Sequence, residues 1–228
     1  MTTMLVFIPG IVGIIIQLAF TISDYHKKYV KAVILKGLAA STFVLTAFLG
    51  WFLYNHSLFG LLVFVGSLFG MAGDIILNLR FIFKDKETTL FVLGSTSFLI
   101  GHIFYIAALA PKIVHLVPCI VIILLLDAAW SVYFFKTTDP AGGNLMKAFG
   151  GVYLLALLSM MVTALDIAVA LPTARSIIFG VGAVFFATSD IMLIMHNFGG
   201  RKHYMFKIVY LIIYYFAQIS IALSLFFH

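Results

Sequence analysis

A few ionisable side chains interrupt the long apolar stretches of this chain, and these are the residues best placed to do chemistry. They are Lys36, Asp74, His102, Asp127 and Asp190. An ionisable group at bilayer depth is costly, so it usually faces the protein interior or a wet cavity and marks a functional site. Asp74 and Asp190 share only one nearby base, Lys36. The surplus carboxylate favours acid–base chemistry over simple charge pairing.

The two aspartates and Lys36 are expected at a similar depth. Asp74 and Asp190 each lie about six residues before the end of their apolar run, and Lys36 lies about four residues into its own. At 1.5 Å per residue this places them roughly 6 to 9 Å below one membrane boundary. They can therefore form one polar layer. The alternative is that Asp74 and Lys36 are a buried ion pair that only holds helices together.

Small residues accompany both acids at helical spacing. In the run 58–79, one helix face carries Gly66, Gly70, Asp74 and Asn78. In the run 176–196, the corresponding face carries Ala183, Ala187 and Asp190. Because small residues let helices approach closely, both faces are expected to point into the protein.

Further polar side chains are expected nearer the middle of the bilayer. With Asn78, they are candidates for binding substrate or positioning water: His102, Tyr105, Tyr214, Tyr215 and Gln218. A lone mid-membrane histidine is usually a hydrogen-bonded packing residue, so His102 is given a supporting role. No His-x-x-x-His pair accompanies the acids, and we expect no catalytic metal and no cofactor. Asp127 has only Ser131 at helical spacing, and we interpret it as structural or as lining a water pocket.

Composition decides which elements hold these groups. Of 228 residues, 64% are hydrophobic and 10% are charged, against about 25% charged in soluble domains, so a water-soluble globule is excluded. A spanning helix needs roughly 20 apolar residues. Eight such runs lie near 4–23, 32–54, 58–79, 91–110, 113–135, 148–171, 176–196 and 207–227. We predict an all-α, multi-pass integral membrane protein of eight transmembrane helices, with residues 1–228 forming a single domain.

The basic residues predict an orientation. Of 14 Lys and Arg, eleven lie in or beside the loops that follow the first, third, fifth and seventh helices. The positive-inside rule puts those loops in the cytoplasm and both termini on the other side. The net charge of +6 is spread over short loops, so we expect membrane lipids as partners and no nucleic acid. Short loops without a targeting signal favour a bacterial inner membrane over the endoplasmic reticulum.

The two halves of the chain resemble each other at an offset of 116 residues. Gly73-Asp74-Ile75-Ile76-Leu77 aligns with Ser189-Asp190-Ile191-Met192-Leu193, and His102 aligns with Gln218. A duplicated four-helix unit keeps its topology, so residues 1–112 and 113–228 are predicted to be parallel repeats about an axis along the membrane normal. Chance similarity between apolar segments is the alternative. Under the repeat model the two aspartates face each other across the axis.

Four ordered blocks of residues resemble the signature of the YhhN-like lysoplasmalogenase family. They are Gly73-Asp74-Ile75-Ile76-Leu77, Phe98-Leu99-Ile100-Gly101-His102-Ile103-Phe104-Tyr105, Ser189-Asp190-Ile191-Met192-Leu193 and Tyr214-Tyr215-Phe216-Ala217-Gln218. The chain departs from the family where Gly37 follows Lys36 in place of proline, and where Gly101 precedes His102 in place of alanine. Neither departure touches an acid.

This resemblance implies a membrane hydrolase that cleaves the vinyl ether bond of lysoplasmalogens. The products are a fatty aldehyde and glycerophosphoethanolamine or glycerophosphocholine, and the family's catalytic aspartates fall on Asp74 and Asp190. Vinyl ether hydrolysis passes through an oxocarbenium-like cation, as glycoside hydrolysis does with two carboxyls. We therefore expect one protonated aspartate as general acid and one ionised aspartate that stabilises the cation and orients water. Lys36 is expected to keep one carboxylate ionised or to bind the lipid phosphate.

The sequence is also compatible with two other classes of protein. A small-molecule or lipid transporter also combines repeats with carboxylates inside the membrane, but neither acid-bearing helix has the internal proline expected of a broken transporter helix. Gly180 and Gly182 keep that alternative open. A receptor or structural scaffold is the third reading, and neither needs surplus acids within the membrane. The oligomeric state is left undecided.

Overall fold

The computed structural model describes residues 7–137, 143–200 and 203–227, and within these ranges the chain is helical without strands. Eight long helices follow one another: α2 (Ile8–Tyr25), α3 (Tyr29–Leu49), α4 (Leu58–Leu79), α5 (Glu87–Leu109), α6 (Leu116–Thr137), α7 (Gly143–Ala170), α8 (Ala174–Phe198) and α9 (Tyr204–Leu223). Four short segments complete the described part of the fold. The π-helical η1 (Gly50–Asn55) continues α3, and the other three are single 3₁₀ turns: η2 (Lys84–Lys86), η3 (Ala110–Lys112) and η4 (Ser224–Phe226).

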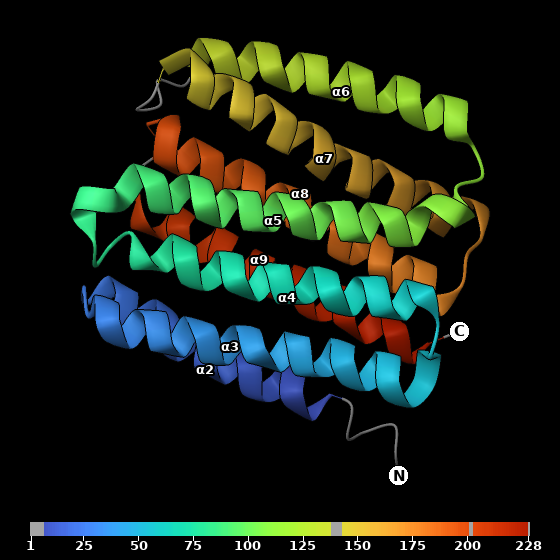
Figure 1. The fold of residues 1–228 in the computed structure, drawn as a ribbon, viewed down its shortest axis with the longest axis horizontal. Helices are drawn as coiled ribbons and strands as arrows, with labels where there is room; N and C mark the ends of the chain where they lie inside the picture. Colours follow the sequence, from blue (N-terminus) through green and yellow to red (C-terminus); the bar gives the residue numbers. More distant parts are fainter. Residues whose placement is uncertain (1–6, 138–142, 201–202, 228) are drawn as a thin grey trace.

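All eight long helices are long and apolar enough to cross a membrane, which confirms the predicted class of all-α, multi-pass membrane protein. They form a bundle in which consecutive helices run antiparallel, with α2 and α3 at one edge and α6 at the other (Figure 1). Helices α2, α4, α6 and α8 all end at one end of the bundle, which we call the basic end because the predicted lysine- and arginine-rich segments follow these helices in the sequence (Figure 1). Helix α2 begins and α9 ends at the opposite end. The orientation of the bundle, with the basic end in the cytoplasm and both termini on the other side of the membrane, stays a prediction.

Side chains near the connections define where several helices begin. The Ser57 hydroxyl accepts a hydrogen bond from the Gly60 amide at 3.2 Å and caps α4. Thr173 and Ser176 form a reciprocal capping box at the start of α8. These contacts satisfy amide groups that have no partner within the first turn of a helix. They fix the starts of the two helices that carry the acids.

Close helix packing around α4 and α8 depends on glycine. A Cβ added at Gly66 of α4 would lie 2.5 Å from the Tyr105 ring and 3.1 Å from the Gly101 carbonyl oxygen of α5. A Cβ added at Gly182 of α8 would lie 3.0 Å from the Ala217 carbonyl oxygen of α9. Both helices therefore approach their neighbour at backbone distance. The Gly66 contact lies on the predicted small-residue face of α4, and the predicted face of α8 is buried at Ala183 and Ala187, whereas Gly182 was not part of that face.

The largest buried cluster lies among α4, α5, α7, α8 and α9, and includes Leu157, Phe179, Phe186 and Ala217. Helix α6 adds little to the interior, because its buried residues are Cys119, Ile123 and Phe134. The acid-bearing helices are thus held from several sides, while α6 leans mainly on α7 (Figure 1).

Candidate active site

Asp74 and Asp190 line the same cavity, near the basic end of the bundle. The cavity has a volume of about 80 Å³, or roughly 950 Å³ when all the space at its open mouth is counted, and its polar lining includes Lys36, Asn78 and Tyr153. Much of its wall is apolar, with side chains such as Phe20, Leu77, Phe91, Phe98, Phe134, Phe149, Leu193 and Leu211. The space combines two buried carboxyls with a surface suited to a hydrocarbon chain.

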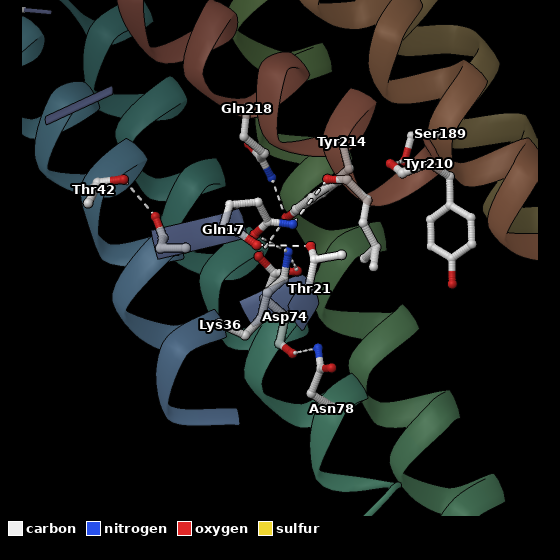
Figure 2. Close-up of polar contacts among 12 residues, drawn as sticks. Gln17, Thr21, Lys36, Thr42, Asp74, Asn78, Ser189, Tyr210, Tyr214 and Gln218 are labelled. Carbon is white, nitrogen blue, oxygen red and sulfur yellow. Dashed lines mark hydrogen bonds and ion pairs between the residues drawn. The ribbon is translucent and has the colours of Figure 1, made fainter. Parts of the chain in front are cut away.

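Asp74 contacts a cation and a phenol. The Lys36 ammonium lies 3.3 Å from Asp74 Oδ1, and the Tyr214 hydroxyl donates to Oδ2 at 3.0 Å. Lys36 also donates to Gln17 Oε1 at 3.5 Å and lies 4.5 Å from the centre of the Tyr214 ring. Figure 2 shows Gln17, Lys36 and Tyr214 gathered around Asp74. With Lys36 only 1% exposed, the carboxylate of Asp74 is the charge that compensates this ammonium.

A chain of hydrogen bonds fixes the Tyr214 hydroxyl. Tyr105 donates to Gln218 Oε1 at 3.1 Å, and Gln218 Nε2 donates to the Tyr214 oxygen at 3.0 Å. Because that oxygen already accepts from Gln218, its own proton is directed to Asp74. Tyr105 and Gln218 therefore act on Asp74 through Tyr214 and do not line the cavity themselves.

Asp190 has different neighbours. The Tyr153 hydroxyl donates to Asp190 Oδ2, and His102 Nε2 lies 3.7 Å from the same oxygen and 3.4 Å from the Tyr153 hydroxyl. Among the described residues, no lysine or arginine pairs with Asp190. Ser189 donates to the Tyr210 carbonyl at 3.0 Å and anchors this turn of α8 to α9. The two acids thus differ in the charge of their partners.

Aromatic rings separate the two polar groups. The Phe186 ring lies 4.8 Å from the His102 ring and 5.4 Å from the Tyr214 ring. Phe98 meets Tyr214 edge-on at 5.8 Å. Apolar rings therefore lie between the two sets of hydrogen bonds, and of these two phenylalanines Phe98 also lines the cavity. Each carboxyl keeps its own partners.

A family model, the YhhN family, matches residues 14–225, nearly the whole chain. The chain belongs to the YhhN family, the lysoplasmalogenase family. No curated protein and no solved structure matches the chain. The family resemblance inferred from the four sequence blocks is therefore confirmed.

In this YhhN-family protein, three other candidate residues have different surroundings. Tyr215 is turned away from the acids, because its hydroxyl bonds Thr42 Oγ1 at 2.6 Å and the Gly10 carbonyl at 3.5 Å. Asn78 lines the cavity, and its amide nitrogen donates to the Asp74 backbone carbonyl at 2.8 Å. Asp127 lies on α6 with an Oδ1 that has no partner among the described residues, and it is not part of the cavity lining.

Sequence reasoning missed Tyr153, the direct partner of Asp190. The 116-residue offset gave no signal for it, because it matches Tyr153 to Gly37 and Lys36 to Val152. It also missed Gln17, which contacts Lys36 from α2. The described residues contain no cluster of three His, Cys, Asp or Glu side chains that could hold a metal ion.

Proposed function

We propose that this membrane protein hydrolyses the vinyl ether bond of lysoplasmalogens, using Asp74 and Asp190 as a catalytic pair. One observation carries the proposal: two buried carboxyls with unlike partners line one largely apolar cavity. Membership of the lysoplasmalogenase family supports the substrate class. The substrate is an ethanolamine or choline lysoplasmalogen, and the products are a fatty aldehyde and the glycerophospho-alcohol.

The unlike partners give the two acids separate roles in this proposal. Asp74 lies against the Lys36 ammonium and works as the ionised member, which stabilises positive charge and accepts a proton from water. Asp190 has two phenol or imidazole neighbours and no lysine or arginine partner among the described residues. It works as the protonated member and delivers the first proton. Paired acids divide the acid and base roles when their environments give the two carboxyls different pKa values.

The reaction balances with these two residues and water. Asp190 gives its proton to the β-carbon of the vinyl ether, and the α-carbon becomes an oxocarbenium ion opposite the Asp74 carboxylate. Water adds to that carbon and passes a proton to Asp74. The addition product is a hemiacetal. The hemiacetal hydroxyl returns a proton to Asp190 as the carbon–oxygen bond to glycerol breaks, and Asp74 protonates the departing oxygen. The aldehyde is released, and both carboxyls regain their first states.

The apolar wall suits the hydrocarbon tail of such a substrate. Phe134 and Ile194 line both the main cavity and a smaller apolar pocket among α6, α7 and α8. A tail that lies along this wall leaves the acids next to the ether, and the headgroup faces the basic end. This arrangement matches the depth at which a lysolipid holds its ether, just below the headgroup.

The first test is aldehyde release from a lysoplasmenylethanolamine by purified protein in detergent. We expect Asp74→Asn and Asp190→Asn each to lower kcat by about 10²- to 10⁴-fold, the usual contribution of a positioned acid or base. Asp85→Asn, at an exposed position of the basic end, is the matched control and should keep full activity. The saturated alkyl ether should not react, because it has no alkene to protonate. Full activity in both cavity variants would rule out the two-acid mechanism.

The dependence of kcat on pH tests the division of roles. A reaction that needs ionised Asp74 and protonated Asp190 has a bell-shaped profile, whose limbs belong to the coupled pair. Activity falls at low pH as the base of the pair gains a proton, and it falls at high pH as the acid of the pair loses its proton. The residual activity of Asp74→Asn should lack the low-pH limb, and that of Asp190→Asn should lack the high-pH limb. The reverse pattern would exchange the two roles.

A further inference from the structure

Arg80 is a buried arginine whose donors are incompletely used. It follows the last residue of α4 as its C-cap and is only 6% exposed. Its Nη2 donates to Asn197 Oδ1 at 3.2 Å, whereas Nε has no hydrogen-bond partner among the described residues. A guanidinium carries five N–H donors and no acceptor. A buried one with a spare donor is suited to an anion that is not part of the chain.

Arg80 lines the same cavity as the two aspartates, together with Lys207. Lys207 lies 2.6 Å from Asp24 Oδ2, so its charge is already balanced. No carboxylate pairs with Arg80 in the part of the chain that the structure describes. The guanidinium lies over the Phe81 ring at 4.8 Å and the Phe91 ring at 5.3 Å. These rings hold it in place without neutralising it.

The spacing along α4 relates Arg80 to the acids. Six residues separate it from Asp74, which is about 9 Å along a helix. In a lysoplasmalogen, the glycerol backbone separates the vinyl ether from the phosphate. A substrate whose ether lies at Asp74 and whose headgroup faces the basic end therefore brings its phosphate toward Arg80.

We infer that Arg80 binds the phosphate oxygens of the lysophospholipid headgroup and thereby sets how deep the ether lies between the two acids. The inference rests on the proposed function and extends it to a binding residue in the cavity wall. Arginine suits this task because its planar donors match phosphate oxygens, often in pairs. A cation at a helix C-terminus also interacts favourably with the helix dipole. An interaction with the helix dipole alone would explain neither why Arg80 lines the cavity nor why its Nε has no partner among the described residues.

Binding measurements with lipids that cannot be hydrolysed test this inference separately from the hydrolysis. The probes are a saturated 1-alkyl lysophosphatidylethanolamine, which has the phosphate but no vinyl ether, and the corresponding 1-alkylglycerol, which has neither. The wild-type protein should bind the lysophospholipid about 10- to 100-fold more tightly, as expected for hydrogen bonds to a charged group. Arg80→Gln should remove that difference and leave alkylglycerol binding unchanged. Arg80→Lys should keep part of it, and Lys31→Gln, at an exposed position of the same end, should keep all of it.

Several outcomes would overturn the inference. One is equal binding of the two probes by the wild-type protein, a result that needs no variant to fold. Another is an Arg80→Gln variant that binds the lysophospholipid as tightly as the wild-type protein does. Displacement of the lysophospholipid by inorganic phosphate at equal concentration would assign the site to a free anion. Failure of the proposed function gives a different pattern: no aldehyde is released from any lysoplasmalogen, while the phosphate-dependent binding persists.

Kinetics supply a second readout. With a lysoplasmenylethanolamine, Arg80→Gln should raise KM by about 10- to 100-fold, because the lost contact is to the headgroup. With a 1-alkenylglycerol, the variant and the wild-type protein should have the same kcat/KM. An equal loss on both substrates would mean that Arg80 only supports the fold, and would contradict the inference.

Discussion

Each aspartate of the cavity accepts a hydrogen bond from a tyrosine, but only Asp74 also faces a lysine, and the proposed chemistry depends on that difference. Lys36 and both aspartates could be predicted from sequence, because an ionisable group in an apolar helix is rare and costly. Tyr153 could not, because it is one of ten tyrosines in the chain and a phenol is ordinary in a membrane helix. The direction of each side chain also decides its role, and Tyr215, next to Tyr214 in sequence, faces α2 and α3.

The tyrosine pair offers a matched test at the scale of single residues. Tyr153→Phe removes the hydroxyl that donates to Asp190 and keeps the ring. We expect kcat on a lysoplasmenylethanolamine to fall by about 10- to 100-fold, since one hydrogen bond to a charged or reacting group is lost. Tyr215→Phe removes a hydroxyl that bonds Thr42 and should leave kcat within about threefold. Similar kinetics for the two variants would argue against a role of Tyr153 at the acid.

At the scale of helices, apolar runs predict the buried part of each element better than its ends. The run 58–79 coincides with α4, Leu58–Leu79, because a capping serine and an arginine bound it closely. The run 91–110 misses the first turn of α5, which begins at Glu87, and the run 148–171 begins five residues after Gly143 of α7. Helices continue into polar residues at the membrane surface, where hydropathy gives no signal. The glycine contacts could be predicted as close approaches, but their partner residues could not.

Alanine substitutions at two glycines distinguish the cost of disturbing close helix packing from the gain in helix propensity. Gly66→Ala would place a Cβ 3.1 Å from the Gly101 carbonyl oxygen and 2.5 Å from the Tyr105 ring. We expect a loss of about 1–3 kcal/mol in unfolding free energy, as for other overpacked sites, measured by denaturant titration in detergent. Gly37→Ala meets only Ile75 at 3.6 Å, an ordinary contact. It should be neutral or stabilise by about 0.5–1 kcal/mol, because alanine favours a helix over glycine. Equal effects of the two changes would contradict the packing argument.

At the scale of the whole molecule, we propose that residues 1–112 and 113–228 are two copies of one four-helix unit. Helix α3 packs against α9, and α5 packs against α7, which are equivalent contacts under the 116-residue offset. Each aspartate also takes a partner from the other half, Tyr214 for Asp74 and His102 for Asp190. These contacts support a pseudo-two-fold arrangement about the cavity. Sequence alone predicted the offset but not the crossed partners, which depend on how the halves pack.

Division of the chain between Lys112 and Ile113 tests this arrangement. Transmembrane helices insert first and associate afterwards, so the two fragments should assemble when they are expressed together. We expect the co-purified pair to hydrolyse lysoplasmenylethanolamine within about tenfold of the intact chain, the difference reflecting the lost linkage. Either fragment alone should be inactive, because each aspartate lacks its partner from the other half. Activity in a single fragment would contradict a shared site.

The crossed partners have a consequence for how a substrate lies in the cavity. Two separate copies of such a unit would associate as a symmetric dimer, and a lysolipid between their identical carboxyls would have two equivalent ways to bind. In the single chain, Lys36 has no charged counterpart, because position 152 is a valine. The carboxyls are then no longer interchangeable. In the proposed reaction, one face of the vinyl ether would then be turned toward the proton donor and the other toward the water, and we expect a single binding orientation to be productive.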